Sequence, residues 1–234
     1  MFKKRKKNTQ TASRKLVTRD APKSITLEQF RIIRENINFL SPDKKLKTLL
    51  FTSSFSGEGK STMAANVAIV FAQAGKRVLL VDADMRKPTT HYTFKSTISP
   101  GLSHLLTKRR ALDEVIKRTH FKGLELVTCG KMPINPAELL SSKVMDDLIV
   151  EMKSKYDIIV IDAPPILLVA DAQILSNKCD GTILVVSSGA TEKNNAKRAK
   201  GLLENSKANV LGVILNNYKL EKGHYYYNYN SAKE

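Results

Sequence analysis

A glycine-rich stretch in the first third of the chain holds the residue types that bind nucleotide phosphates. It reads SSFSGEGKST over residues 53–62 and follows the apolar run KTLLFTS. Backbone amides beside Gly57 and Gly59 can turn toward an anion, Lys60 can neutralise β- and γ-phosphates, and the Ser61 hydroxyl can hold Mg²⁺. A strand before such a loop and a helix after it are the context that a phosphate-binding P-loop requires. The stretch therefore predicts a nucleoside-triphosphate site.

The residues expected to contact the nucleotide lie in this loop and at one distant position. Asn216 follows the last apolar run of the chain, and we expect it beside the adenine edge. No Asn-Lys-x-Asp guanine signature follows a strand, which favours ATP over GTP. The full set is Ser56, Gly57, Glu58, Gly59, Lys60, Ser61, Thr62 and Asn216.

Three carboxylates stand at the ends of two other apolar runs. RVLLVDADMRKP carries Asp82 and Asp84, and DIIVID ends at Asp162. Because the carboxyl ends of parallel strands share one edge of a sheet, we expect all three acids to converge beside Lys60. Asp162 would be the Walker B aspartate that serves Mg²⁺. Acids at strand ends are otherwise often helix caps, an interpretation that the nearby P-loop disfavours.

A single Walker B aspartate would suffice for Mg²⁺ binding and hydrolysis, so the additional pair of Asp82 and Asp84 needs another explanation. A tyrosine hydroxyl has a pKa near ~10, so its attack on a γ-phosphate at neutral pH is helped by a carboxylate that accepts its proton. Phosphoryl transfer to tyrosine is therefore chemically sensible here. Arg86 and Lys87 could stabilise phosphate charge or bind an acidic acceptor, although exposed basic residues before a proline are common.

Short apolar runs separated by helical patterns predict the fold. Near-continuous apolar strands joined by helices indicate an α/β domain of the P-loop NTPase type, with a doubly wound, mainly parallel sheet. An amphipathic helix over about 26–40, with Thr26 as its N-cap, comes first. The expected strands are 47–53, 77–82, 124–128, 157–162, 181–187 and 209–215, and the later helices are 60–74, 101–117 in two pieces, 137–153, 170–178 and 192–206.

Composition divides the chain into a domain and two tails. The net charge is +17, and residues 1–23 hold nine basic side chains against one acid, so they are expected to form a disordered arm before a domain at 24–217. The arm could bind anionic lipid or nucleic acid, or could merely aid solubility. No apolar run reaches the length of a membrane span. Cys129 and Cys179 are expected to be plain buried thiols of a cytoplasmic protein.

The end of the chain, residues 218–234, is rich in tyrosine. HYYYNYN holds four tyrosines, and with Tyr218 this segment has five of the chain's seven. The segment follows the last predicted strand, so it leaves the sheet at the edge where the P-loop lies. The segment could be an aromatic binding patch or a disordered end of accidental composition, but its position at this edge favours a role as phosphate acceptor, at Tyr225, Tyr226, Tyr227 and Tyr229.

The set SGEGKST, VLLVDADMRKP and VIDAPP resembles the bacterial tyrosine kinases (BY-kinases) that govern capsule and exopolysaccharide synthesis, in particular the separate kinase subunit of Gram-positive bacteria. The resemblance covers about residues 24–234. It implies that Lys60 and Ser61 bind ATP and Mg²⁺, that Asp82 is the base or the organiser of the metal site, and that Asp84 and Asp162 serve the metal. Ser54 at the first P-loop glycine is usual in that family, whereas Ser56 replaces a frequent proline.

The resemblance also implies assembly and partners. Glu28, Arg31 and Arg34 match an E-x-x-R-x-x-R motif that packs against the neighbouring subunit in a ring, which would bring one subunit's tail to the next subunit's site. From the residues alone they are the solvated side of an amphipathic helix. The implied partners are a membrane activator of the polysaccharide export complex, which places the kinase at the inner face of the membrane, and a tyrosine phosphatase. PINPAELLSSK, 133–143, recurs in the family without assigned chemistry.

The main alternative within this fold is a partition or cell-division-positioning ATPase that acts as a nucleotide-switched binding module on membrane or DNA. Such ATPases resemble one another in a KGGxGK[ST] loop whose first lysine reaches across a dimer. Phe55 occupies that position here. The missing lysine and the tyrosine-rich tail both favour the kinase.

Overall fold

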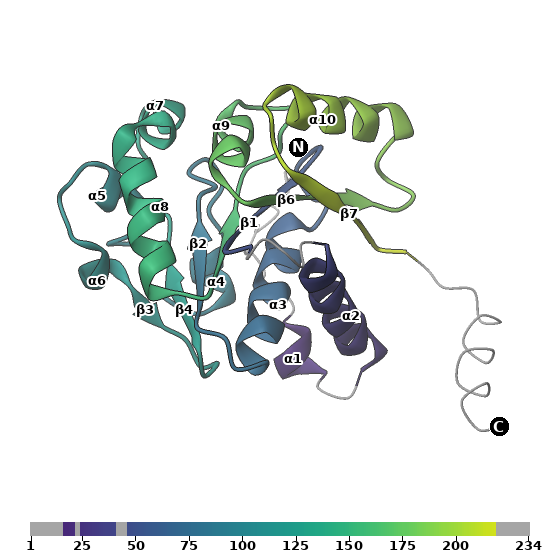
Figure 1. Cartoon of the computed structure of the whole chain (residues 1–234), viewed down its shortest axis with the longest axis horizontal. Coiled ribbons are helices and arrows are strands. Elements are labelled where there is room, and N and C mark those ends of the chain that lie inside the picture. Colours follow the sequence, from purple (N-terminus) through teal and green to yellow (C-terminus); the bar gives the residue numbers. More distant parts are fainter. Residues whose placement is uncertain (1–15, 22–23, 41–45, 219–234) are drawn as a thin grey trace, which may run out of the picture.

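Seven strands form one sheet in the part of the chain that the structure, a computed structural model, describes: residues 16–21, 24–40 and 46–218 (Figure 1). The order is β3-β4-β2-β5-β1-β6-β7, and all neighbours are parallel except β3 and β4. The strands are β1 (Thr48–Ser53), β2 (Val78–Asp82), β3 (Lys117–Arg118), β4 (Leu124–Val127), β5 (Ile158–Asp162), β6 (Gly181–Ser187) and β7 (Val210–Asn216).

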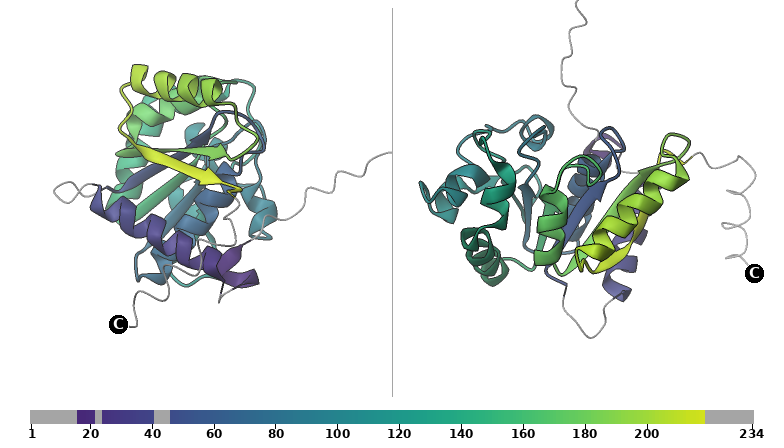
Figure 2. Two further views of the ribbon diagram at one scale, coloured as in Figure 1. Left: turned by 90° about the vertical axis from the view of Figure 1, so that its right-hand side faces the viewer. Right: turned by 90° about the horizontal axis from the view of Figure 1, so that it is seen from above.

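Helices cover both faces of this sheet, as the left view of Figure 2 shows with α10 on one side and α2 on the other. Alternate residues of the central strands enter two separate apolar clusters, one with α1 to α3 and one with α5 to α10. The helices are α1 (Val17–Asp20), α2 (Ile25–Phe39), α3 (Lys60–Gln73), α4 (Thr90–Thr93), α5 (Leu102–Leu106), α6 (Leu112–Val115), α7 (Pro136–Ser141), α8 (Lys143–Lys155), α9 (Asp171–Lys178) and α10 (Lys193–Asn205).

The strand order determines where the predicted site residues lie. β5 lies between β2 and β1, so the ends of these three strands are neighbours. Asp82 pairs in register with Asp162, and Asp162 with Phe51, two residues before the end of β1. The loop that follows β1 therefore begins beside both aspartate-bearing strand ends.

The predicted doubly wound, mainly parallel α/β fold is confirmed, with three local corrections. Ser24, not Thr26, caps α2, because its hydroxyl accepts the amide of Leu27 at 3.3 Å. The predicted helix over 137–153 is two helices, since Ser142 adopts an extended backbone between α7 and α8. Residues 117–118 form an antiparallel edge strand rather than the end of a helix.

Part of the predicted basic arm is packed on the domain. Leu16 and Val17 are buried in the cluster that contains α2 and α3, and the amide of Val17 donates to Asn66 Oδ1 at 2.8 Å. Apolar burial outweighs the charge of the surrounding stretch at these two positions. The prediction of a disordered arm is therefore wrong for residues 16–21, while residues 1–15 and 22–23 lie outside the described part.

Two further observations concern the predictions on membrane spans and cysteines. Among residues 16–21, 24–40 and 46–218, no helix is long and apolar enough to cross a membrane. Cys129 and Cys179 are buried free thiols, as expected, and burial raises the pKa of each to about 12.

Replacement of Asp180 by Ala should lower the free energy of unfolding by about 1–3 kcal/mol at pH 7. Asp180 Oδ2 accepts the amides of Lys47 and Thr48, both at 2.9 Å, and Oδ1 accepts Lys153 Nζ at 2.7 Å. Urea unfolding measures the change, with the exposed Asp147→Ala on α8 as the control.

The same contacts set the pH dependence of this loss. Burial opposes ionisation of Asp180, but Lys153 and the two amides outweigh it and hold the pKa below its usual value. The contribution is therefore present above the pKa of the unfolded chain, near ~4, and is lost as the pH falls through the folded value. A destabilisation of equal size at pH 7 and at pH 2 would contradict this account.

Candidate functional site

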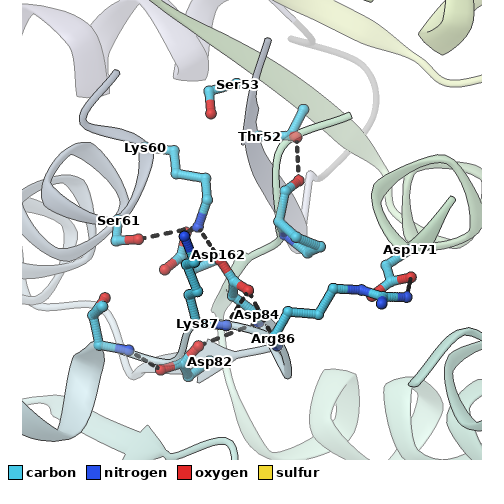
Figure 3. Close-up of polar contacts among 12 residues, drawn as sticks. Thr52, Ser53, Lys60, Ser61, Asp82, Asp84, Arg86, Lys87, Asp162 and Asp171 are labelled. Atoms are coloured by element: carbon cyan, nitrogen blue, oxygen red, sulfur yellow. Dashed lines mark hydrogen bonds and ion pairs between the residues drawn. The ribbon is translucent and has the colours of Figure 1, made fainter. Parts of the chain in front are cut away.

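Lys60, the first residue of α3, lies at the centre of the converging strand ends (Figure 3). Its Nζ donates to Asp84 Oδ2 at 2.8 Å, to Asp162 Oδ1 at 3.1 Å and to Ser61 Oγ at 3.2 Å. Burial by itself would lower the pKa of Lys60, but the carboxylates of Asp162 and Asp84 outweigh it and raise the pKa. The ammonium group therefore stays charged where a phosphate would lie.

The loop before Lys60 has the backbone conformation of an anion-binding loop. Gly57 and Gly59 have φ values of +93° and +97°, which a side chain would strain. Lys60 follows at the N-terminus of a 14-residue helix, whose positive end favours negative charge.

The side chain of Glu58 braces this loop through hydrogen bonds. Its Oε2 accepts the amides of Ser54 at 2.7 Å and Phe55 at 3.2 Å, while Oε1 accepts the hydroxyl of Thr191. Asn216, at the end of β7, donates from Nδ2 to the Glu58 carbonyl at 2.8 Å. Both residues were expected to contact nucleotide, and the structure places both as supports of the loop.

Replacement of Gly59 by Ala should weaken nucleotide binding about tenfold or more. A Cβ at this position would lie 2.1 Å from Asn216 Nδ2, and the left-handed backbone adds a cost of ~1–2 kcal/mol. Titration with a fluorescent ATP analogue measures the affinity. Gly201→Ala, in α10, is the matched control, because its added Cβ meets nothing within 4 Å. Equal affinities for both variants would contradict the prediction.

Asp82 is buried behind the site and organises the chain that follows β2. Its Oδ1 accepts the amide of Asp84 at 3.2 Å. Its Oδ2 accepts the amides of Thr89 and Thr90, both at 3.1 Å, and the Thr90 hydroxyl at 2.5 Å. Burial, with the charge of Asp162 as the second cause, raises the pKa of Asp82 to about 7.

Asp84 and Asp162 differ in how their carboxylates are satisfied. Asp84 Oδ1 accepts the amides of Lys87 at 2.9 Å and Arg86 at 3.3 Å, and although burial opposes its ionisation, Lys60 lowers its pKa. Asp162 is fully buried, and its Oδ2 has no hydrogen-bond partner among the described residues. Burial raises the pKa of Asp162 despite the nearby Lys60.

These oxygen atoms fit Mg²⁺, which prefers one or two carboxylates together with water and substrate phosphates. The unpartnered Oδ2 of Asp162 lies in the same cluster as Asp84 and the Ser61 hydroxyl, the three predicted ligands. This set contains only two carboxylates. Groups of three or more His, Cys, Asp or Glu side chains that could hold a metal do not occur in the described part.

A cavity of about 460 Å³ opens beside Lys60. Six of the predicted site residues line it: Ser56, Gly57, Gly59, Lys60, Ser61 and Asp84. Glu58, Thr62, Asp82, Asp162 and Asn216 are not in its wall. The rest of the wall is Arg86, Lys87, Pro88, Thr89, His91, Tyr92, Ile98 and Met132.

Sequence reasoning missed most of this second wall and one buried acid. Asp171 binds the guanidinium of Arg86 through both oxygens, at 3.0 Å to Nε and 2.9 Å to Nη2 (Figure 3). Nothing in the spacing of Arg86 and Asp171 links them, because Arg86 lies in the loop after β2 and Asp171 is the first residue of α9. Among the missed wall residues, Thr89 directly follows the VLLVDADMRKP motif and Met132 directly precedes the PINPAELLSSK motif.

The predicted self-association helix is partly tied to its own subunit. Arg31 pairs with Glu28 at 3.0 Å on the exposed side of α2. Arg34 donates to the carbonyl of Val70 in α3 at 3.1 Å and pairs with Glu35. Arg34 thus stabilises the contact of α2 with α3, which leaves Glu28 and Arg31 more accessible.

The predicted phosphate acceptors fall at the end of the chain. Tyr225, Tyr226, Tyr227 and Tyr229 lie outside the described residues. Tyr218, just after β7, is described and is exposed.

Comparisons with known proteins agree with the geometry. The family model described as an AAA domain matches residues 46–198. Tyrosine-protein kinase YwqD of Bacillus subtilis is 47% identical over 230 residues, which cover 98% of this chain and 97% of that protein.

Solved structures give the same result. The crystal structure of the chimerical protein CapA2B2 is 40% identical with a TM-score of 0.84, over 88% of this chain and 90% of that one. The kinase domain of Escherichia coli tyrosine kinase ETK is 26% identical with a TM-score of 0.83, over 90% and 84%. These relatives support the kinase interpretation over the partition-type ATPase. The chain belongs to the family of bacterial tyrosine-protein kinases.

Proposed function

We propose that this kinase transfers the γ-phosphoryl group of ATP to tyrosines of its own C-terminal segment, Tyr225, Tyr226, Tyr227 and Tyr229. The observation that carries the proposal is the position of Lys60, held between Asp84 and Asp162 at 2.8 and 3.1 Å at the edge of the sheet. Four tyrosines within five residues, at the end of a chain of this family, supply an acceptor.

The transfer needs charge neutralisation on one side and a proton acceptor on the other. The phenol oxygen forms a bond to the γ-phosphorus while the bond from that phosphorus to the β–γ bridging oxygen breaks, and ADP leaves. Lys60 neutralises the transferred group. The phenolic proton passes to the Asp82 and Asp84 pair, in which Asp84 faces the cavity and Asp82, with a pKa of about 7, has the higher proton affinity.

Magnesium would be held by Ser61, Asp84 and Asp162 together with the phosphates, and it supplies further charge neutralisation at the phosphate oxygens. The unpartnered Asp162 Oδ2 supports this assignment. The Ser61 hydroxyl is kept in the cluster by Lys60 Nζ at 3.2 Å.

Assembly and setting follow from the family. The proposal includes a homo-oligomeric ring with contacts through Glu28, Arg31 and Arg34, an activator in the membrane, a tyrosine phosphatase and other protein substrates. The kinase would regulate capsular or extracellular polysaccharide synthesis at the inner face of the membrane. Residues 1–15 would add attraction to anionic lipid through their basic side chains.

Mass spectrometry of the purified full chain after incubation with ATP and Mg²⁺ tests the proposal, with and without the cytoplasmic fragment of a membrane activator. We expect phosphotyrosine within 225–229, and its loss when all four tyrosines are replaced by Phe. Tyr218→Phe is the matched control and should keep the modification. Phosphate found only outside 218–234, or none with the activator present, would overturn the autophosphorylation proposal.

A further inference from the structure

The cavity beside Lys60 has an apolar part of its lining that phosphate binding does not explain. Pro88, Tyr92, Ile98 and Met132 line the same cavity as the P-loop residues. Tyr92 is 47% exposed and Met132 58% exposed, although both are large apolar side chains. They come from α4 and from the loop after β4, so two separate segments bring apolar surface to one cavity.

The Tyr92 part of this surface is supported by residues that are themselves held by packing and hydrogen bonds. The Tyr92 ring lies against the His91 ring, with centroids 3.9 Å apart and planes tilted by 41°. His91 is buried in turn, and Thr89 and Thr90, at the start of the same segment, are held by Asp82. The aromatic wall is thus anchored to the carboxylate that organises the catalytic edge.

The direction of attack on the γ-phosphorus indicates which group the apolar part of the cavity binds. A phosphoryl acceptor approaches the γ-phosphorus roughly in line with the leaving oxygen, hence from the side away from the nucleotide. The P-loop residues Ser56, Gly57, Gly59, Lys60 and Ser61 form the phosphate-binding part of the cavity wall. The acceptor therefore meets the wall formed by Lys87, Tyr92, Ile98 and Met132, where an aromatic ring can pack on a ring edge and a thioether.

We propose that Tyr92, Ile98 and Met132 form the seat for the ring of the acceptor tyrosine, and that the occupant is the segment 219–234 of this chain. The proposal rests on the proposed function and adds the residues that select the acceptor. The seat holds a phenol with its hydroxyl toward Lys60 and Asp84. A serine or threonine side chain is too short to use the same surface and reach the phosphate, so the seat favours tyrosine.

The exit point of the chain supports this occupant. Asn216, two residues before the last described residue, donates to the carbonyl of Glu58 at 2.8 Å, and the neighbouring P-loop residues Gly57 and Gly59 line the cavity. Tyr225 lies nine residues further on, which allows up to ~30 Å of extended chain. The segment can thus reach the seat of its own subunit or of a second copy.

Steady-state kinetics of the full chain with a synthetic peptide of residues 219–234 tests the seat. Met132→Ser and Tyr92→Ser should each raise the KM for the peptide about tenfold, with nucleotide affinity unchanged within about twofold. Met132→Leu should restore the peptide KM. Val150→Ser, at a 69% exposed position on α8, is the matched control and should change neither quantity.

The outcomes distinguish a failure of the proposed tyrosine seat from a failure of the proposed kinase function. Wild-type phosphorylation of the peptide with unchanged KM in both serine variants overturns the seat and leaves the kinase proposal standing. Equal losses of peptide and nucleotide affinity also overturn it, because the wall then serves the nucleotide. Failure of the wild-type chain to phosphorylate either the peptide or its own tail, with an activator fragment present, overturns both.

Discussion

Replacement of Lys60 by Met is expected to lower the rate of tyrosine phosphorylation by about 10²–10³-fold, the usual effect of removing one preorganised charge-stabilising donor. Lys60 Nζ is the cation that lies between Asp84 and Asp162 and lines the cavity. Without it the transferred phosphoryl group would lose the cation that lies between the two carboxylates. Initial rates of phosphate incorporation into the 219–234 peptide measure the effect.

The same change should also destabilise the fold. Removing one partner from a buried ionic cluster typically costs ~3–5 kcal/mol, because the remaining charges lie unpaired out of water. Rates must therefore be referred to the folded fraction, determined by circular dichroism. Lys193→Met, an exposed lysine on α10, is the control for loss of a positive charge and should leave both quantities unchanged. Activity of Lys60→Met within tenfold of the wild type would contradict the assignment.

Replacement of Asp162 by Asn is expected to separate activity from stability. Phosphorylation should fall about 10²-fold or more, because the carboxylate proposed to serve the metal is lost. The free energy of unfolding at pH 8 should rise. The amide introduced at this position would keep an oxygen for Lys60, and Lys60 would keep its pair with Asp84 at 2.8 Å.

The expected rise in the free energy of unfolding follows from the pKa shifts of Asp162 and Asp82. Burial raises the folded-state pKa of Asp162, and burial together with the charge of Asp162 raises that of Asp82 to about 7. The folded state therefore binds more protons than the unfolded state above pH ~4, so stability declines as the pH rises from there toward 7. The Asp162→Asn variant removes one of these charges and relieves the other, so its stability should depend less on pH.

Urea unfolding at pH 5.5 and pH 8, with a chelator and without nucleotide, measures the stability and its pH dependence, and initial rates of phosphate incorporation into the 219–234 peptide measure the activity. The wild type should lose more stability between these pH values than Asp162→Asn does. Asp147→Asn, at an exposed position on α8, is the matched control and should follow the wild type. A large loss of stability in Asp162→Asn at pH 8 would show that the ionised carboxylate stabilises the fold.

Local patterns were sufficient to predict the elements that carry the chemistry. The run from β1 through the glycine-rich loop into α3 is contiguous, so its strand, turn and helix signals reinforce one another within residues 48–73, and the strands at 78–82, 158–162 and 181–187 appear close to their expected bounds. The motifs around Lys60, Asp82 and Asp162 also sufficed to identify the family. Their roles in the site stay predictions.

Contacts between distant segments were not predictable. The Arg86 pair with Asp171 joins residues 85 apart, and Arg34 binds a carbonyl 36 residues away. Glu58 was expected at the nucleotide as part of the P-loop and Asn216 as a contact of the adenine edge, and the side-chain hydrogen bonds of both brace the loop. Leu16 and Val17 are buried although the charge around them predicted an arm.

The sequence by itself determined which side chains can do chemistry here and that Asp82 and Asp162 end strands while Lys60 follows one, because residue type and apolar runs are local properties. Only the tertiary structure decided which of them meet. The order β2-β5-β1 sets Asp82 beside Asp162 and both beside the P-loop, and it buries Asp82 behind Asp84. Strand order depends on how the helices pack on the two faces of the sheet, which is a property of the whole chain.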